Sequence, residues 1–184
     1  MQWGLLSGCL ALLSLPAHTQ ACWDEAAQRY GVSSQLLYAV AKVESHLNPK
    51  ALNLSHRQRT GSYDIGLMQI NSSNLPALAR FGITESDLYS PCTNIHVGAW
   101  LLAQTLARQG LSWDGVGAYN AACTQLKGAA CQNARRRYAW KVYQQLPSSA
   151  ALSAQPNARK TAPPPQGLSE AKSPLFILAA RVSP

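Results

Sequence analysis

One glutamate of this chain lies on the apolar face of a predicted helix. Apolar residues recur there at steps of three and four: Leu36, Leu37, Val40, Val43 and Leu47. Because helical residues four apart point in nearly the same direction, Glu44 shares the direction of Val40. A carboxyl in apolar surroundings near the C-terminal end of a helix keeps its proton to a higher pH. Such a group can act as the general acid that cleaves a glycosidic bond, and afterwards as the base.

Periodicity alone is also consistent with a second interpretation of Glu44. In it the side chain lies in solvent at the helix rim, where it pairs with one of three nearby basic residues: Lys42, Arg57 or Arg59. Three ordered motifs favour the catalytic interpretation instead. The sequence ESHLNP begins at Glu44, GLMQINS at Gly66 and AYNA at Ala118. This set resembles the lytic transglycosylase (SLT) domain of the lysozyme superfamily, and within it the IagB/IpgF-like proteins and the conjugation-system muramidases. The resemblance covers residues 22–146.

The resemblance implies that Glu44 is the catalytic acid and base. It also implies that the second and third motifs line the glycan groove with Met68, Gln69, Ala118, Tyr119 and Asn120. Amides of Gln and Asn can bond the N-acetyl and hydroxyl groups of amino sugars. Tyr119 can point its hydroxyl toward Glu44 while offering its ring to a sugar. Core packing is the preferred role for Leu67 and Ile70, whereas both roles stay open for Met68.

The sequence departs from the larger soluble transglycosylases at several positions. Asn53 stands where those relatives usually carry a substrate-contacting Ser, and Asn71 where they often carry Met. Both amides are candidate substrate contacts. The usual Gly after the third motif is Ala122, and the segment 52–61 is lengthened. Other substrate contacts in that segment are therefore not carried over from the family.

Asp64 leaves two chemistries open, because the segment 64–72 also resembles the second-carboxylate segment of animal-type lysozyme. Two carboxyls about 5 Å apart are typical of a retaining hydrolase. In the transglycosylase alternative, Glu44 protonates the glycosidic oxygen after N-acetylmuramic acid and then activates the C6 hydroxyl of the same sugar. The product is a 1,6-anhydromuramoyl end. We favour this alternative, with Asp64 as a structural residue, because the resemblance to that branch is stronger.

The chain is expected to form a single mainly α, lysozyme-like domain over residues 22–146, since no sustained alternation indicates a large sheet. Residues 1–21 are predicted to be a secretory signal peptide cleaved after Ala21. Their apolar run is shorter than the roughly 20 residues of a membrane-spanning helix, so no stable membrane span is expected. The Pro-, Ser- and Ala-rich residues 147–184 are predicted to be a disordered tail.

Capping residues predict the helices of the domain. The first begins at Asp24 and ends at Arg29, with Gly31 in the left-handed conformation. Ser33 or Ser34 caps the second. The remaining helices are predicted over residues 75–81, 93–109, 113–120 and 133–146.

The mature chain would keep an even set of cysteines: Cys22, Cys92, Cys123 and Cys131. In an exported protein such a set predicts two disulfides. Loop closure favours Cys123 with Cys131, which leaves Cys22 with Cys92. A metal site is not expected, because the cysteines lack a Cys-x-x-Cys spacing and the histidines are scattered. No cofactor is expected either.

The net charge of +8 indicates an anionic neighbourhood. For an exported chain this favours the cell wall or a membrane surface over nucleic acid, whose binding proteins interleave basic and aromatic residues. The resemblance implies a periplasmic enzyme that opens peptidoglycan for a type III, type IV, pilus or conjugation apparatus. A non-catalytic wall-binding subunit of such an apparatus is the alternative from another functional class.

Overall fold

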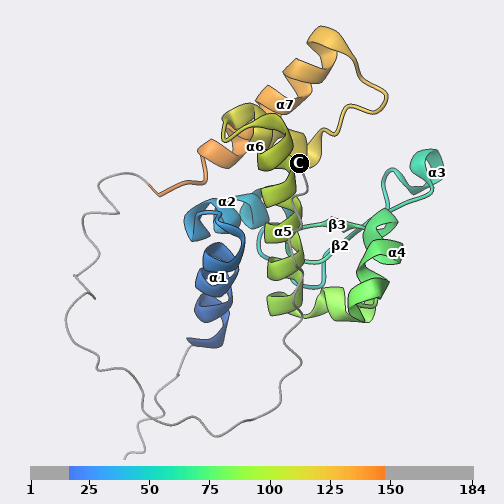
Figure 1. Cartoon of the computed structure of the whole chain (residues 1–184). Helices are drawn as coiled ribbons and strands as arrows, with labels where there is room; N and C mark the ends of the chain where they lie inside the picture. The colour runs from blue at the N-terminus through green and yellow to red at the C-terminus, as the bar shows by residue number, and fades with distance from the viewer. Residues whose placement is uncertain (1–16, 148–184) are drawn as a thin grey trace, which may run out of the picture.

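The structure is a computed structural model that describes residues 17–147 (Figure 1). Residues 1–16 of the predicted signal peptide and residues 148–184 of the predicted tail lie outside the described residues. Within the described part the chain is mainly helical, as predicted, with one small three-stranded sheet. None of the helices in this part has the length and apolar character needed to cross a membrane.

The first two helices carry the N-terminal half of the core. Helix α1 spans Ala17–Tyr30 and α2 spans Ser34–Ser45. Helix α1 begins before the predicted start at Asp24, because residues 17–23 contain no Gly or Pro to interrupt it. Gly31 ends α1 with φ +66°, as predicted. Ser33 is the N-cap of α2, although its side chain makes no capping hydrogen bond.

Helix α5, Pro91–Gln109, is the central element of the fold (Figure 1). It packs against α1, α2 and α6. Ile95, Val97 and Leu102 of α5 are fully buried, and so are Leu37 and Val40 of α2. The apolar face predicted for α2 therefore does meet the core, and it fixes the direction in which the end of α2 points.

The other three predicted helices are all present. The predicted helix over 75–81 consists of α4, Leu75–Leu78, continued by a 3-10 turn, Ala79–Phe81. Helix α6, Trp113–Asn120, has the predicted bounds, and α7, Gly128–Tyr143, starts and ends earlier than predicted. Sequence reasoning missed the short α3, Arg57–Thr60, and two 3-10 turns, Ser72–Asn74 and Ser86–Tyr89.

The sheet consists of three antiparallel strands in the order β1-β2-β3, formed by Leu52–Asn53, Asp64–Ile65 and Ile70–Asn71. Its register pairs Asn53 with Asp64, and Asp64 with Asn71. Directly paired residues point to the same face of a sheet. The three side chains therefore form a row across the sheet. Strands of two residues leave no alternating pattern, which is why the sequence did not reveal them.

A buried asparagine attaches the second motif to α5. The side-chain oxygen of Asn94 accepts a hydrogen bond from the Met68 N–H at 2.7 Å. Its amide nitrogen donates to the Ile65 and Leu88 carbonyls at 3.0 and 2.7 Å. Gly66 has φ +75°, and a Cβ there would lie 2.3 Å from the amide nitrogen of Asn94. Only glycine fits this turn, so the motif needs Gly66 to approach α5 so closely.

Both predicted disulfides are confirmed. Cys22 of α1 bonds to Cys92 of α5, and Cys123 bonds to Cys131 across the loop between α6 and α7. Because Cys22 is the first residue after the predicted cleavage site, the first bond would hold the mature N-terminus against the central helix.

Candidate active site

Glu44 occupies the penultimate position of α2. Its side chain is partly buried, and Tyr138 of α7 donates a 2.5 Å hydrogen bond to its Oε1 atom. Helix α2 ends at once, because His46 and Leu47 both adopt positive φ angles of 55° and 66°. This sharp turn leaves the carboxyl at the end of the helix, where it faces the cleft.

The surroundings of Glu44 favour its protonated form. Burial raises the pKa of the carboxyl to about 7, and the negative charge of Asp64 adds to the rise. The hydrogen bond from Tyr138 and the positive charge of Lys141 act in the opposite direction. Burial dominates these effects. The group therefore holds a proton near neutral pH and remains able to release it, as a general acid and base must.

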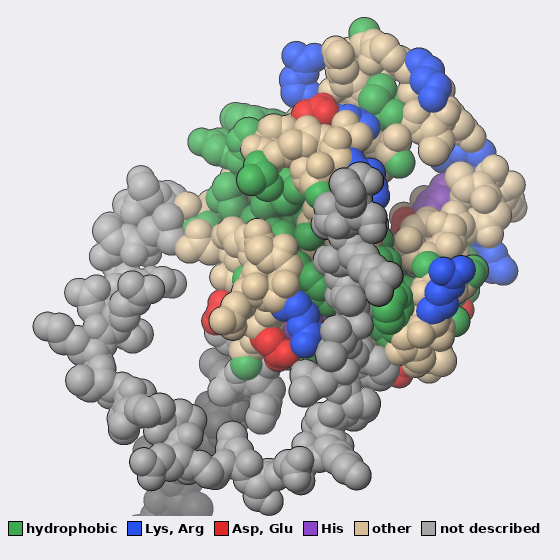
Figure 2. Space-filling view, in the orientation of Figure 1, with side chains coloured by type: hydrophobic (Ala, Val, Ile, Leu, Met, Phe, Trp, Pro, Cys, Tyr) green, Lys and Arg blue, Asp and Glu red, His purple; other side chains and the backbone are tan. Residues whose placement is uncertain are grey.

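A cleft of about 910 Å³ opens beside Glu44. One wall comes from the segment 53–74, which includes the sheet and α3, and the other from α6 and the loop that follows it. The end of α5 closes the floor with Leu101, Thr105 and Arg108. In Figure 2 the cleft is the hollow between the α7 end of the molecule and the side that carries α3 and α4.

Gln69 lies in the cleft with its amide group oriented by the backbone. Its amide nitrogen donates to the carbonyl of Gly66 at 2.9 Å and to that of Ala51 at 3.5 Å. The side-chain oxygen is thus the part of Gln69 that can accept a hydrogen bond from a ligand. The positive φ of 48° at Gln69 turns the residue out of the strand direction and toward the cleft.

The third motif lines the opposite wall. Ala118, Tyr119 and Asn120 all border the cleft, and Asn120 is exposed. The hydroxyl of Tyr119, however, donates to the Met68 carbonyl at 2.8 Å. The charge of Glu44 acts on Tyr119, so the two groups lie near each other, but the single hydroxyl proton of Tyr119 joins the second and third motifs and is not donated to Glu44. The phenol that does reach Glu44 is Tyr138.

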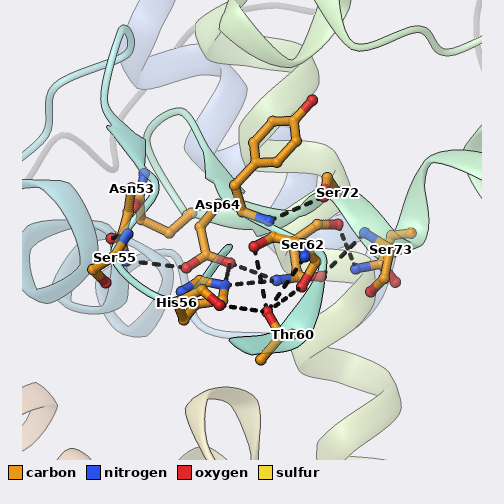
Figure 3. Close-up of polar contacts among 12 residues, drawn as sticks. Asn53, Ser55, His56, Thr60, Ser62, Asp64, Ser72 and Ser73 are labelled. Carbon is orange, nitrogen blue, oxygen red and sulfur yellow. Dashed lines mark hydrogen bonds and ion pairs between the residues drawn. The ribbon is translucent and has the colours of Figure 1, made fainter. Parts of the chain in front are cut away.

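Asp64 is surrounded by polar partners, which include its two neighbours in the row across the sheet (Figure 3). Asn71 donates to its Oδ1 at 2.8 Å and Asn53 to its Oδ2 at 3.2 Å, while the Nε2 of His56 lies 3.7 Å from Oδ1. The amide oxygens of both asparagines accept backbone N–H groups, from Ser55 and Ser73. Asn53 and Asn71 thus border the cleft with their amides already committed to holding Asp64 and the adjoining loops.

Met68 does not line the cleft. Its side chain is fully buried, and a Cβ at Gly98 of α5 would lie 2.3 Å from its sulfur. The prediction of a substrate contact is therefore wrong for this side chain, because the turn at Gly66 directs it into the core. Leu67 and Ile70 are buried in the core as predicted.

Sequence reasoning missed Tyr138 and the second hydrogen bond that orients the end of α2. The Oγ of Ser45 donates to the Leu67 carbonyl at 2.7 Å, which ties the residue beside Glu44 to the second motif. A signal for Tyr138 was present in the sequence. In the basic helix α7, Tyr138 and Val142 are four residues apart and both buried, so they mark its inward face. Among the described residues no group of acidic, His or Cys side chains could hold a metal ion.

Comparison with known proteins places this site in a family. The family described as "Transglycosylase SLT domain" matches residues 21–141. Invasion protein IagB of Salmonella typhimurium is 37% identical over 145 residues, covering 78% of this chain and 86% of the relative. Protein IpgF of Shigella flexneri is 39% identical over 139 residues, covering 75% and 87%. The X polypeptide of Escherichia coli K12 is 37% identical over 141 residues, covering 76% and 80%.

A solved structure has the same fold. An inactive mutant of the lytic transglycosylase Slt from Pseudomonas aeruginosa superposes with a TM-score of 0.52 at 23% identity. The match covers 70% of this chain and 23% of that longer chain. At this identity the likeness concerns the fold alone, and it agrees with the lysozyme-like architecture expected from the sequence.

Proposed function

Because the chain belongs to the transglycosylase SLT domain family of peptidoglycan lytic transglycosylases, we propose that Glu44 cleaves the β-1,4 bond between N-acetylmuramic acid and N-acetylglucosamine and leaves 1,6-anhydromuramic ends. One observation carries this proposal. The Glu44 carboxyl has a pKa of about 7 and borders a cleft that Gln69, Tyr119 and Asn120 also line.

The proposed reaction needs one carboxyl in two protonation states. Protonated Glu44 gives its proton to the glycosidic oxygen, and the bond from that oxygen to C1 of N-acetylmuramic acid breaks. The acetamido oxygen of the same sugar bonds to C1 and stabilises the cation. Deprotonated Glu44 then removes the proton of the C6 hydroxyl, whose oxygen displaces the acetamido oxygen at C1. The proton returns to Glu44, and no water, metal or cofactor is consumed.

A lysozyme-type hydrolase is the second candidate, because Asp64 borders the same cleft and lies close enough to raise the pKa of Glu44. In that reaction Asp64 would stabilise the cation or act as the nucleophile. The three polar partners of Asp64 hold its carboxylate in place and argue for a structural role instead. We therefore retain the transglycosylase as the proposal.

The products distinguish the two reactions. Purified peptidoglycan is digested with the protein, and the muropeptides are analysed by mass spectrometry. The proposal predicts 1,6-anhydromuramic ends, whereas reducing muramic ends would establish the hydrolase. Glu44→Gln should bind peptidoglycan and release no muropeptides, because its amide keeps the shape and cannot transfer the proton. Binding by the wild-type chain with no muropeptides released would instead support a non-catalytic wall-binding subunit.

We further propose that the protein acts in the periplasm, where it opens the wall for a type III, type IV, pilus or conjugation apparatus. The name of the relative IagB, an invasion protein, supports such a role, as does the predicted signal peptide. The test is a deletion strain complemented with wild-type or Glu44→Gln protein. Restored secretion or transfer with the wild type alone supports the role, and full function without the gene contradicts it.

A further inference from the structure

Three aromatic side chains form an exposed cluster where the first residue of α6 meets the last turn of α7. The rings of Trp140 and Tyr143 stack with centroids 5.4 Å apart, and Trp113 meets Tyr143 edge-on at 5.4 Å. These side chains are 59%, 51% and 44% exposed. We call these residues the aromatic cluster. Large aromatic rings left in solvent beside one another usually mark a binding surface.

The aromatic cluster adjoins a groove of about 630 Å³ that is separate from the catalytic cleft. Trp113 is at one end of this groove, which then follows α7 past Ala139, Arg136 and Gln132 to Lys127. The lining mixes apolar surface with hydrogen-bonding side chains. A concave surface of this composition suits an amphipathic ligand that carries many hydroxyl and amide groups.

The groove lies beside the catalytic cleft. Cys123, Leu126 and Arg135 line both of them. The disulfide between Cys123 and Cys131 fixes the intervening loop, and Arg135 donates to the Ala121 carbonyl at 3.1 Å and to Asp114 at 2.8 Å. A rigid loop therefore lies between the catalytic cleft and the groove. One long polymer can occupy both of them.

The charge of this surface suits an anionic polymer. Helix α7 carries Arg135, Arg136, Arg137 and Lys141 and no acidic residue. Figure 2 shows Lys and Arg side chains gathered at the α7 end of the molecule, with hydrophobic side chains beside them. The sequence-based view that the basic residues lack aromatic neighbours is therefore wrong for α7. Arg136 and Trp140 are one helical turn apart and both exposed.

We propose that the groove beside α7, together with the aromatic cluster, is a second binding surface for the peptidoglycan glycan strand, which holds the enzyme on the polymer while the cleft cleaves it. The polymer named here rests on the proposed function. Sugar rings can stack on Trp140 and Tyr143, their hydroxyl and acetamido groups can bond Gln132, and the free carboxylates of the peptides attached to muramic acid can pair with Arg136 and Lys127.

Two other occupants fit the observations less well. A membrane surface is flat and would leave the polar groups of a concave groove unfilled. A nucleic acid carries a phosphate at every nucleotide, whereas Arg135 of the groove is already paired with the carboxylate of Asp114, which lines the groove too. A glycan strand has hydroxyl donors for that carboxylate, and in the proposed function it binds in the cleft on the other side of the shared loop.

The test compares binding and cleavage in the full chain. Binding to purified peptidoglycan is measured by cosedimentation in the Glu44→Gln background, so that the polymer stays intact. The test variant is Trp140→Ala with Tyr143→Ala, and Trp140→Gln alone is the second variant if the double variant does not fold. The matched control is Tyr38→Ala, which removes a ring of similar exposure from α2. Cleavage is measured with Glu44 restored, on peptidoglycan and on a soluble tetrasaccharide of the same repeat.

The proposal predicts that the double variant binds peptidoglycan roughly tenfold more weakly, while the control binds as the parent does. Cleavage of peptidoglycan should fall. Cleavage of the tetrasaccharide should stay unchanged, because four sugars do not span both the catalytic cleft and the groove beside α7. Equal binding by variant and control would overturn the proposal. So would a loss confined to phosphatidylglycerol vesicles or single-stranded DNA. A wild-type chain that cleaves neither substrate would contradict the proposed function, and the binding comparison would still decide this inference.

Discussion

Tyr138 and Glu44 are separated by 94 residues in the chain, yet the Tyr138 hydroxyl donates directly to a Glu44 carboxyl oxygen. Helix α7 thus completes a site whose other parts come from α2, the sheet, the second motif and α6. The contact stabilises the carboxylate form, which opposes the effect of burial on the pKa of Glu44. It also fixes which oxygen of the carboxyl stays available to the substrate, because Oε1 is already bonded.

Tyr138→Phe is expected to shift the alkaline limb of the pH–rate profile to higher pH. Without the hydrogen bond the pKa of Glu44 rises, so the acid form persists further above pH 7. Loss of orientation should lower kcat by roughly fivefold, equivalent to about 1 kcal/mol. The measurement is the rate of peptidoglycan solubilisation from pH 5 to 9, with Tyr38→Phe as control. An unchanged profile would mean that Tyr138 does not act through Glu44.

Asp64→Asn should shift the same limb in the opposite direction. The negative charge of Asp64 raises the pKa of Glu44, so its removal lowers that pKa and the acid form is lost at lower pH. The pH optimum of cleavage should therefore fall, while activity at acidic pH is largely kept. If the variant is inactive at every pH and is folded by circular dichroism, Asp64 takes part in the chemistry and the hydrolase becomes the better assignment.

Glu44→Gln is expected to stabilise the protein at alkaline pH. The pKa of Glu44 is raised from 4.5 to about 7 in the folded state, so folding favours the bound proton. The wild type therefore loses stability as the pH rises from about 4.5 to 7. The glutamine variant does not lose this stability, because its side chain does not ionise. We expect the variant to be more stable by roughly 1–3 kcal/mol at pH 8 and equal at pH 4. Urea unfolding at both pH values measures this difference, and equal stability at pH 8 would show that Glu44 is well solvated.

Local patterns were enough to predict most of the helices and the position of Glu44. Apolar spacing placed Glu44 at the end of the core-facing helix, and the turn residues placed the bounds of α6 correctly. These features depend on contacts within one or two helical turns, which a sequence displays directly. The disulfide pairing followed from loop length in the same way.

Long-range contacts explain what the sequence did not reveal. The phenol at Glu44 was assigned to Tyr119, but the packing of α7 against α2 brings Tyr138 there, and the Tyr119 hydroxyl bonds to Met68. The row of Asn53, Asp64 and Asn71 depends on a sheet register set by strands of two residues. Neither arrangement leaves a periodic signal, because each joins segments that are separated in the chain.

Asn94→Ala should destabilise the whole domain by roughly 2–4 kcal/mol. The variant leaves the Met68 N–H and the Ile65 and Leu88 carbonyls without the partner that they have in the buried core. Asn133→Ala, at an exposed position of α7, is the control and should change stability little. Urea unfolding compares the two. A small effect at Asn94 would mean that water replaces its amide, so that the second motif does not depend on this attachment.

The two disulfides should contribute differently to stability and to binding. The Cys22–Cys92 bond joins residues 70 apart in sequence and the Cys123–Cys131 bond residues 8 apart. Loop-closure entropy therefore predicts losses of roughly 4 and 2.5 kcal/mol in the free energy of unfolding when each pair is replaced by serine.

The segment closed by the Cys123–Cys131 bond, however, borders both the catalytic cleft and the groove beside α7. Replacing Cys123 and Cys131 should thus weaken peptidoglycan binding at a temperature where both variants are folded, while replacing Cys22 and Cys92 should not. Equal binding by both variants would show that the loop keeps its shape without its disulfide.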